Sequence, residues 1–336
     1  MLKVDVVQLR GDSFTIGKEI GKTLIDKPIV NVFEQITKPE VNIRDVESLF
    51  TIYSPHLLEE IKGIAEGMEI SYEKAAALFS GYDLPRVQAM GCSAVITTDY
   101  YVRNYDFSPD FYDGVFVMAQ PHSGLASAGY SLQAIGRHDG VNEAGLVVGL
   151  HFVSNEGYKT GISAWTSNRI VLDNCSSVED AIHLLKEIPH AACYNFSLAD
   201  AKDVIAVVEA SPDKVLVRSD PEYLSCVNHF QVEELVSKNR KAIDGSLQRN
   251  IYMQGLKNDG QDVEEMFTIF SEPTSPLFYT HYDQLFGTLH TFAYARKNSR
   301  ILTTIARGEQ IMDISFSDWV NGMNIPMTTM NGMCKE

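Results

Sequence analysis

Hydrophobic and polar positions divide the chain into a helical first quarter and a β-rich remainder. Residues 1–11 alternate between apolar and polar side chains, which predicts a β-strand. Apolar residues then recur at helical spacing over 16–24 and again over 57–64. Ser71 is placed to cap a further helix, and this part of the chain ends at 83–85. We therefore expect one strand followed by a helix-rich segment.

Beyond residue 91, short apolar runs of strand length replace the helical spacing. We expect strands at 93–96, 101–105, 115–119, 132–135, 145–150, 195–198, 204–209, 215–217, 224–227, 288–294 and 300–306. Helical spacing returns at 169–174, 178–188 and 263–270. Strand blocks separated by helices are typical of packed sheets with helices outside. This order favours an α+β fold, and a four-layer αββα sandwich with a helix-rich N-terminal leader fits it.

Composition and charge narrow the class of protein. With 336 residues, 45% of them hydrophobic, the chain can bury a large core. Its formal net charge of -16 repels phosphates and anionic lipid surfaces, so we expect neither a nucleic-acid partner nor a membrane partner. Residues 1–11 lack the apolar centre of a signal peptide, and no apolar run has the length of a membrane span. We therefore expect a cytoplasmic protein.

Cysteine and histidine spacing gives no sign of a metal site. The five cysteines are far apart and form no CxxC pair, which predicts reduced thiols. The histidines include no HxxxH pair, and the one HxxE match, His56 to Glu59, suits the start of a surface helix better than half a zinc site. We expect no metal and no other cofactor.

One cysteine stands at a Gly-Cys step that opens a small apolar strand. Taken alone, Cys92 reads as a buried structural cysteine, the commoner fate of a lone cysteine. Gly91, however, has no side chain, so the Cys92 sulfur can approach its carbonyl and the backbone can adopt the strained geometry of an N-to-S acyl shift. Hydrolysis of that thioester would make Cys92 a new N-terminus. Its α-amine, with a reference pKa of roughly 7.7 to 8.0, can take the thiol proton. This step predicts self-cleavage between Gly91 and Cys92.

A second group of polar residues lies on the strand expected to pair with that of Cys92. Arg103 and Asp106 are an odd number of residues apart, so a regular strand places them on opposite faces. On this reasoning both reach Cys92 only if Asp106 lies at a bend, and a surface ion pair is the alternative. Beside a nucleophile, the guanidinium would lower the thiol pKa and the carboxylate would anchor the new ammonium group.

Five sequence blocks resemble, in order, those of the penicillin acyltransferase family. They are 91–92, 103–106, 139–146, 227–230 and 246–249, and the similarity extends to 9–11 and 288–291. This is the acyl-coenzyme A:6-aminopenicillanate acyltransferase group, related to the choloylglycine hydrolases. The resemblance implies an N-terminal-nucleophile (Ntn) hydrolase fold. It also implies a leader, residues 1–91, that is released by autocleavage but stays packed on the core, and a catalytic chain over 92–336.

The same resemblance assigns roles to five side chains. It implies Cys92 as the nucleophile, with Arg103 and Asp106 as its direct partners. It further implies Asn228 as a side-chain donor to the oxyanion and Arg249 as a supporting arginine. Asn228 follows an apolar run and could aim its amide N–H at a tetrahedral oxyanion, whereas the alternative is a turn-forming asparagine.

His151 departs from the bile-salt relatives, which usually have an asparagine here that completes the oxyanion hole. Either imidazole replaces that donor or a backbone N–H does, and a hydrogen-bonded wall residue is the alternative. The departure argues against a bile-salt substrate. Asn142 and Glu143 are interpreted as a tight hairpin turn.

Three functions are compatible with these residues. The first is a self-processing Ntn hydrolase or acyltransferase that acts on a linear, non-peptide amide through an acyl-enzyme on Cys92. The second is a choloylglycine-hydrolase-type amidase for bile salts, penicillin V or N-acyl homoserine lactones. The third is an unprocessed, non-catalytic binding protein with the same fold. The expected partners of the enzyme are a small-molecule amide and its own leader, with an acyl-thioester donor as a further candidate. The acyl group, the acceptor and a homo-oligomeric state stay open.

Overall fold

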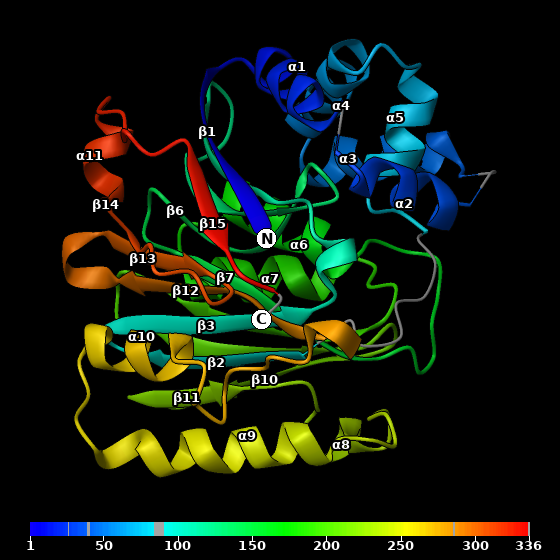
Figure 1. The fold of residues 1–336 in the computed structure, drawn as a ribbon. Helices are drawn as coiled ribbons and strands as arrows, with labels where there is room; N and C mark the ends of the chain where they lie inside the picture. The colour runs from blue at the N-terminus through cyan, green and yellow to red at the C-terminus, as the bar shows by residue number, and fades with distance from the viewer. Residues whose placement is uncertain (26, 39–40, 84–90, 285, 335–336) are drawn as a thin grey trace.

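The computed structural model describes the chain except residues 26, 39–40, 84–90, 285 and 335–336, and it contains two β-sheets (Figure 1). The nine-stranded sheet has the order β10 (Val215–Ser219), β9 (Ile205–Ala210), β8 (Cys193–Ala199), β7 (Val147–Ser154), β6 (Gly136–Asn142), β5 (Ser127–Leu132), β4 (Val115–Pro121), β1 (Leu2–Gly11), β15 (Thr329–Gly332). The six-stranded sheet has the order β11 (Tyr223–Cys226), β2 (Gly91–Thr97), β3 (Tyr100–Phe107), β12 (Gly287–Ala295), β13 (Arg300–Ile305), β14 (Met312–Ser315). The described strands pair antiparallel, apart from β1 and β4, which run parallel.

The two sheets lie face to face, and helices cover the outer face of each (Figure 1). The nine-stranded sheet is covered by α6 (Ala164–Asn174) and α7 (Val178–Glu187), and the six-stranded sheet by α9 (Asp244–Gly255) and α10 (Val263–Ser271). Two short helices are α8 (Glu233–Val236) and α11 (Phe316–Val320). Along β2, Ala94 and Ile96 face the apolar core between the sheets, whereas Val95 faces α10. The predicted four-layer αββα sandwich is confirmed.

The first 83 residues contribute both a strand and a helical bundle. β1 lies inside the nine-stranded sheet, between β4 and β15. The bundle, drawn in blue to cyan in Figure 1, consists of α1 (Ser13–Leu24), α2 (Ile29–Ile36), α3 (Ile43–Tyr53), α4 (His56–Gly67) and α5 (Tyr72–Phe79). Its apolar core also includes Ile135 and Ile170 from the remainder of the chain. This segment therefore packs against the rest of the chain. That residues 1–91 form a leader released by autocleavage stays a prediction, and 84–90 lie outside the described residues.

Glycines set the close contact between α1 and α4. A Cβ added to Gly17 would lie 1.9 Å from the carbonyl oxygen of Glu60, and one added to Gly63 would lie 2.0 Å from that of Phe14. Such a crossing accepts only glycine, because any side chain would push the two backbones apart. This packing explains why glycines interrupt the helical pattern over 16–24.

The strand expected at 132–135 is wrong, because β5 ends at Leu132 and the chain turns before β6. Gln133 and Ala134 have φ values of 57° and 63°, in the left-handed region. The buried carboxylate of Asp113 accepts hydrogen bonds from their main-chain N–H groups at 3.0 and 2.9 Å, which stabilises the turn. The other expected elements are present with shifted ends, including the hairpin turn at Asn142.

His56 begins α4, as predicted, but this end of the helix is not a free surface. His56 Nε2 lies 2.8 Å from Asp173 Oδ2 on α6, and Leu57 is fully buried. Of the HxxE match, His56 therefore contacts α6, whereas Glu59 is exposed and pairs with Lys62 on its own helix.

Candidate active site

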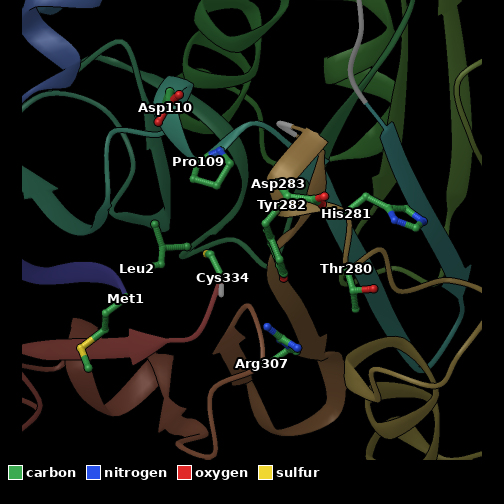
Figure 2. Close-up of a pocket in the computed structure, with 10 residues that line it drawn as sticks. All are labelled: Met1, Leu2, Pro109, Asp110, Thr280, His281, Tyr282, Asp283, Arg307 and Cys334. Carbon is green, nitrogen blue, oxygen red and sulfur yellow. The ribbon is translucent and has the colours of Figure 1, made fainter. Parts of the chain in front are cut away.

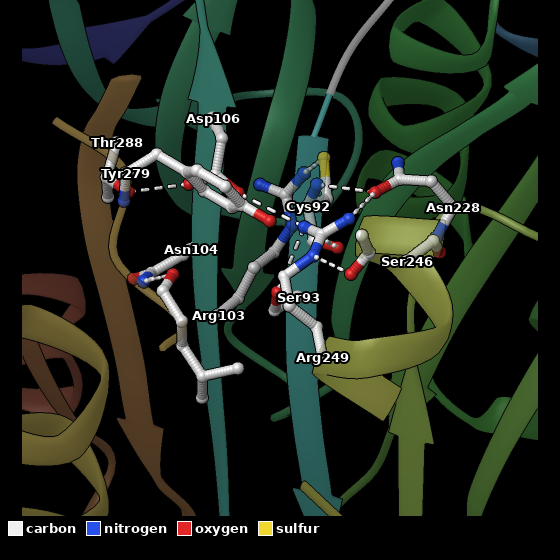
Figure 3. A network of polar contacts seen from close by, with 12 residues as sticks. Cys92, Ser93, Arg103, Asn104, Asp106, Asn228, Ser246, Arg249, Tyr279 and Thr288 are labelled. Carbon is white, nitrogen blue, oxygen red and sulfur yellow. Dashed lines mark hydrogen bonds and ion pairs between the residues drawn. The ribbon is translucent and has the colours of Figure 1, made fainter. Parts of the chain in front are cut away.

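Cys92 is the second residue of β2, and its side chain is fully buried in the core between the two sheets. β3 pairs with β2 in regular register, with Cys92 opposite Tyr105 and Ala94 opposite Arg103. Arg103 Nη2 donates a hydrogen bond to Cys92 Sγ at 3.2 Å and another to the carbonyl oxygen of Leu150 at 2.5 Å. The thiol therefore faces a guanidinium group (Figure 3).

The main chain of Cys92 is held by α9 and by the loop after β11. Asn228 Oδ1 accepts a hydrogen bond from the Cys92 N–H at 2.7 Å. Arg249 Nη1 donates to the Cys92 carbonyl oxygen at 3.1 Å, and its Nη2 donates to Asn228 Oδ1 at 3.0 Å. Figure 3 shows Arg249 reaching from α9 toward both residues. Both polar main-chain groups of Cys92 are thus bound by side chains that the sequence pointed to.

Arg103 and Asp106 lie on opposite faces of β3, as their spacing predicts. Asp106 accepts hydrogen bonds from Arg249 Nη1 at 3.3 Å and from Thr288 Oγ1 at 2.7 Å. The bend at Asp106 that the sequence set as the condition for both residues to reach the site is absent, because β3 stays regular against β2 and the irregularity lies in β12, next to Thr288. Asp106 nevertheless reaches the site, since it is opposite Gly91. A Cβ added to Gly91 would lie 3.1 Å from Asp106 Oδ2.

Burial dominates the charge state of the thiol. Removal from water raises the pKa of Cys92; Arg103 lowers it, Asp106 raises it further, and Arg249 lowers it. The net pKa lies above the ordinary value, so the thiol is neutral at neutral pH in the uncut chain. The effect expected of the Arg103 guanidinium is present, but it is smaller than the effect of burial. Burial likewise raises the pKa of Asp106, although Arg249 opposes this.

Asn228 directs its amide N–H at a contact that the sequence does not predict. Its Nδ2 donates to the carbonyl oxygen of Phe152 at 2.9 Å, while Oδ1 faces Cys92. Its own main-chain N–H donates to Ser246 Oγ at 2.9 Å, which fixes the loop after β11. A role as oxyanion donor would require the contact with Phe152 to break, and this role stays a prediction.

His151 lies on β7, within the buried layer that faces Cys92. Its Nε2 is 2.9 Å from Ser197 Oγ, and the same oxygen is 2.8 Å from the hydroxyl of Tyr101. Burial and the nearby Arg103 hold the pKa of His151 well below its ordinary value, so the ring is neutral. The contact with Ser197 is what a hydrogen-bonded wall residue makes. A role toward an oxyanion stays a prediction.

A buried polar chain on the far side of Arg103 received no role from the sequence. Asp139 Oδ2, on β6, forms an ion pair with Arg103 Nη1, and His290 Nε2 lies 2.8 Å from the same oxygen. The hydroxyl of Tyr112 lies 2.8 Å from His290 Nδ1. The signal that could have revealed this chain is a charged residue inside a buried strand, since such residues are almost never buried without a partner.

A cavity of about 1030 Å³ lies away from these residues, where the chain termini meet the loop before β12 (Figure 2). Its described lining is formed by Met1, Leu2, 109–110, 280–283, Arg307 and Cys334, and includes none of the predicted site residues. Its wall does come near the site, because the hydroxyl of Tyr282 donates to the carbonyl oxygen of Thr288 at 2.6 Å. The predicted site residues therefore do not line this cavity, although its wall contacts the strand β12 beside them.

In the part of the chain that the structure describes, no group of three or more His, Cys, Asp or Glu side chains is arranged to hold a metal ion. Nor does any helix within those residues combine the length and apolar character needed to cross a membrane.

One family model matches more than half of the chain. Residues 95–310 match the family model described as acyl-coenzyme A:6-aminopenicillanic acid acyl-transferase. The match includes Arg103, Asp106, Asn228 and Arg249 but begins after Cys92. None of the curated proteins matches the sequence.

Several solved structures are similar at low identity. Penicillin V acylase from Agrobacterium tumefaciens shares 18% identity over 67% of this chain and 86% of that one, with a TM-score of 0.43. A mutant conjugated bile acid hydrolase from Clostridium perfringens shares 16% identity over 70% and 94%, with a TM-score of 0.48. The Caenorhabditis elegans ortholog of N-acylethanolamine-hydrolyzing acid amidase shares 11% identity over 61% and 93%, with a TM-score of 0.42.

Proposed function

The chain belongs to the acyl-coenzyme A:6-aminopenicillanic acid acyl-transferase family, and we propose that it is a self-processing Ntn hydrolase or acyltransferase with Cys92 as its nucleophile. Its substrate is a linear, non-peptide amide of a small molecule. The observation that carries this proposal is the set of contacts around one residue: Arg103 on the thiol, Asn228 on the N–H and Arg249 on the carbonyl of Cys92. A cysteine that merely fills a core requires none of these contacts.

Self-cleavage proceeds as an N-to-S acyl shift. Cys92 Sγ attacks the carbonyl carbon of Gly91, the thiol proton passes to the peptide nitrogen, and the C–N bond breaks to leave a thioester. Water then attacks the thioester, which gives a carboxylate on Gly91 and regenerates the thiol. Asp106 lies opposite Gly91, and burial raises its pKa, so its carboxyl group is suited to hold a proton beside the scissile bond.

In the cleaved enzyme the α-amine of Cys92 acts as the base. Its nitrogen is the atom that donates to Asn228 Oδ1 in this structure, so the same contact holds the amine next to Sγ. The amine takes the thiol proton, Sγ attacks the amide carbonyl of the substrate, and the proton passes to the departing amine. Water or a second amine then accepts the acyl group from Cys92, which returns the thiol.

The leader remains bound as a second chain after cleavage. β1 keeps its place between β4 and β15, and the carboxylate of Glu60 on α4 accepts hydrogen bonds from Arg169 of α6 at 2.9 and 2.6 Å. Both side chains are almost completely buried. Dissociation would break this buried ion pair, leaving Arg169 with Asp173 as its remaining anion, and would expose the edge of β4; both changes are unfavourable.

Intact mass under denaturing conditions tests self-processing directly. Wild type is expected to give fragments of 91 and 245 residues (336 minus 91), and Cys92→Ala a single chain. Cys226→Ala is the matched control, since Cys226 is equally buried on the neighbouring strand β11, and it should be cut like wild type. Cleaved protein is then assayed with N-acyl amides, with and without an added amine, to separate hydrolysis from transfer. An uncut wild-type chain that turns over no amide would overturn the proposal in favour of a binding protein.

A further inference from the structure

The guanidinium of Arg103 is oriented from the opposite sheet. Arg103 belongs to the six-stranded sheet, yet its Nη1 pairs with Asp139 on β6 and its Nη2 donates to the carbonyl oxygen of Leu150 on β7, both in the nine-stranded sheet. Arg103 and Asp139 are fully buried. A well-placed anion strongly stabilises a buried guanidinium, so the position of Asp139 decides where Arg103 Nη2 points. That nitrogen points at Cys92 Sγ.

Asp139 is in turn held in one orientation. Burial alone would raise the pKa of Asp139, but His290 and Arg103 hold it well below its ordinary value, so the carboxylate is charged. Burial lowers the pKa of His290, so its ring is neutral and donates from Nε2 to Asp139, while Nδ1 accepts from the hydroxyl of Tyr112. The ring of Tyr130 stacks on His290 with centroids 3.7 Å apart, which limits its rotation.

We propose that Asp139, oriented by His290, is a positioning residue that fixes Arg103 with Nη2 against the Cys92 thiol. The geometric part of this proposal stands on the contacts alone, whereas its consequence for catalysis rests on the proposed function. Asp106, which lies nearer to Arg103 in sequence, pairs with Arg249 on the other face of β3. The two arginines around Cys92 thus have separate anions, one on each face of the strand.

The direction in which Asp139→Asn shifts the pKa of Cys92 separates a positioning role of Asp139 from a direct electrostatic role and from a purely structural one. If the negative charge of Asp139 acted directly on the thiol, Asp139→Asn would lower the pKa of Cys92, because an anion disfavours the thiolate. If Asp139 positions Arg103, the same substitution raises that pKa, because the guanidinium leaves Sγ. A purely structural role would lower stability and leave the thiol unchanged.

The experiment combines a titration with a structure. The ultraviolet absorbance of the thiolate is followed against pH in wild type and in Asp139→Asn, matched for extent of cleavage by intact mass, each minus the same protein carrying Cys92→Ala, which isolates Cys92. We expect the midpoint to move upward by about one pH unit or more. A crystal structure of Asp139→Asn is expected to show Arg103 Nη2 beyond hydrogen-bond distance of Sγ. If Cys92 titrates in neither protein while that protein is folded, the crystal structure alone decides whether Asp139 positions Arg103.

Two control variants keep the result interpretable. In an Arg103→Gln background, Asp139→Asn should produce no further upward shift, because there is no guanidinium left to position. Asp106→Asn should shift the midpoint downward, since that carboxylate raises the pKa of Cys92. If Asp139→Asn does not fold, His290→Gln takes its place, with a smaller upward shift expected. An unchanged contact between Arg103 and Sγ, or a midpoint that stays or falls, overturns the proposal. An uncut wild-type chain would affect only the proposed function.

Discussion

Arg249 Nη1 donates a hydrogen bond to the carbonyl oxygen of Cys92 at 3.1 Å, so a helix on the outer face of the six-stranded sheet holds the main chain of the predicted nucleophile. The same nitrogen contacts Asp106 Oδ2 at 3.3 Å and Ser93 Oγ at 3.2 Å. One guanidinium therefore connects the residue after the predicted cut with the carboxylate beside Gly91. The position of α9 and the geometry of the scissile peptide are coupled through this side chain.

Arg249→Gln is expected to slow self-cleavage by about 10- to 100-fold. Charged hydrogen bonds contribute about 1.5–3 kcal/mol, and each 1.36 kcal/mol in a barrier changes a rate about tenfold. The uncut fraction is measured by intact mass at intervals after synthesis. Gln248→Ala is the matched control, because Gln248 is an exposed neighbour on α9. Cleavage of Arg249→Gln at the wild-type rate would show that the contact with the Cys92 carbonyl has no part in the reaction.

Gly91→Ala is expected to slow cleavage and lower the free energy of unfolding. A Cβ at this position would lie 2.6 Å from the ring of Phe286 and 2.9 Å from Cβ of Asp106, so both side chains must move. Such overpacking costs about 1–3 kcal/mol, and it displaces the carboxyl group beside the bond to be cut. Urea unfolding of Gly91→Ala in a Cys92→Ala background measures the stability term without cleavage. Phe286→Ala combined with Gly91→Ala should recover part of the loss, and no recovery would place the strain elsewhere.

The local pattern of apolar and polar residues predicted most of the fold but only part of the candidate active site. Alternation along β2 and β3 correctly separates Arg103 from Asp106, because side-chain direction in a regular strand follows from spacing alone. The turn at Gln133 was missed since it depends on Asp113, a buried carboxylate outside the local window. Asp139 was missed as a partner of Arg103 for a similar reason. Its ion pair crosses from one sheet to the other, and the packing of two sheets is not encoded in the periodicity of either.

Glu60→Gln is expected to weaken the attachment of the leader. The buried ion pair with Arg169 joins α4 to α6. Arg169 keeps Asp173 as a second partner, so the loss is expected to be smaller than the roughly 3–5 kcal/mol that removing one partner of an isolated buried pair costs. Urea unfolding in a Cys92→Ala background, where the chain is continuous, measures this loss. Glu66→Gln is the control, because its pair with Lys18 is exposed. In cleaved protein, the two fragments should separate at lower urea for Glu60→Gln than for wild type. Equal separation would show that the ion pair between Glu60 and Arg169 does not contribute to the attachment of the leader.

Mild acid is expected to destabilise the fold through buried neutral histidines. Burial lowers the pKa of five of them, which are His138, His151, His190, His229 and His290, and brings that of His190 and His229 to about 4. In the unfolded chain histidine titrates near 6.5, so between that value and the folded pKa the unfolded state binds more protons. The free energy of unfolding is therefore highest above about pH 6.5 and falls as the pH drops toward 4. Asp106 and Asp113 act in the opposite sense, because burial raises their pKa.

Within this window each such histidine contributes at most about 1.4 kcal/mol per pH unit to the slope of the free energy of unfolding against pH. Urea unfolding of the Cys92→Ala protein at several pH values between 4.5 and 7, roughly the window set by these pKa shifts, measures the total slope. His190→Gln should remove about one histidine's share, because the His190 ring contacts only the carbonyl oxygen of Leu185 among the hydrogen bonds described for it. His122→Gln, at an exposed position, is the matched control. An unaltered slope in His190→Gln would mean that the His190 ring is protonated as readily in the folded protein as in the unfolded chain. Water would then have to reach this ring, which the packing of α7 and β8 encloses.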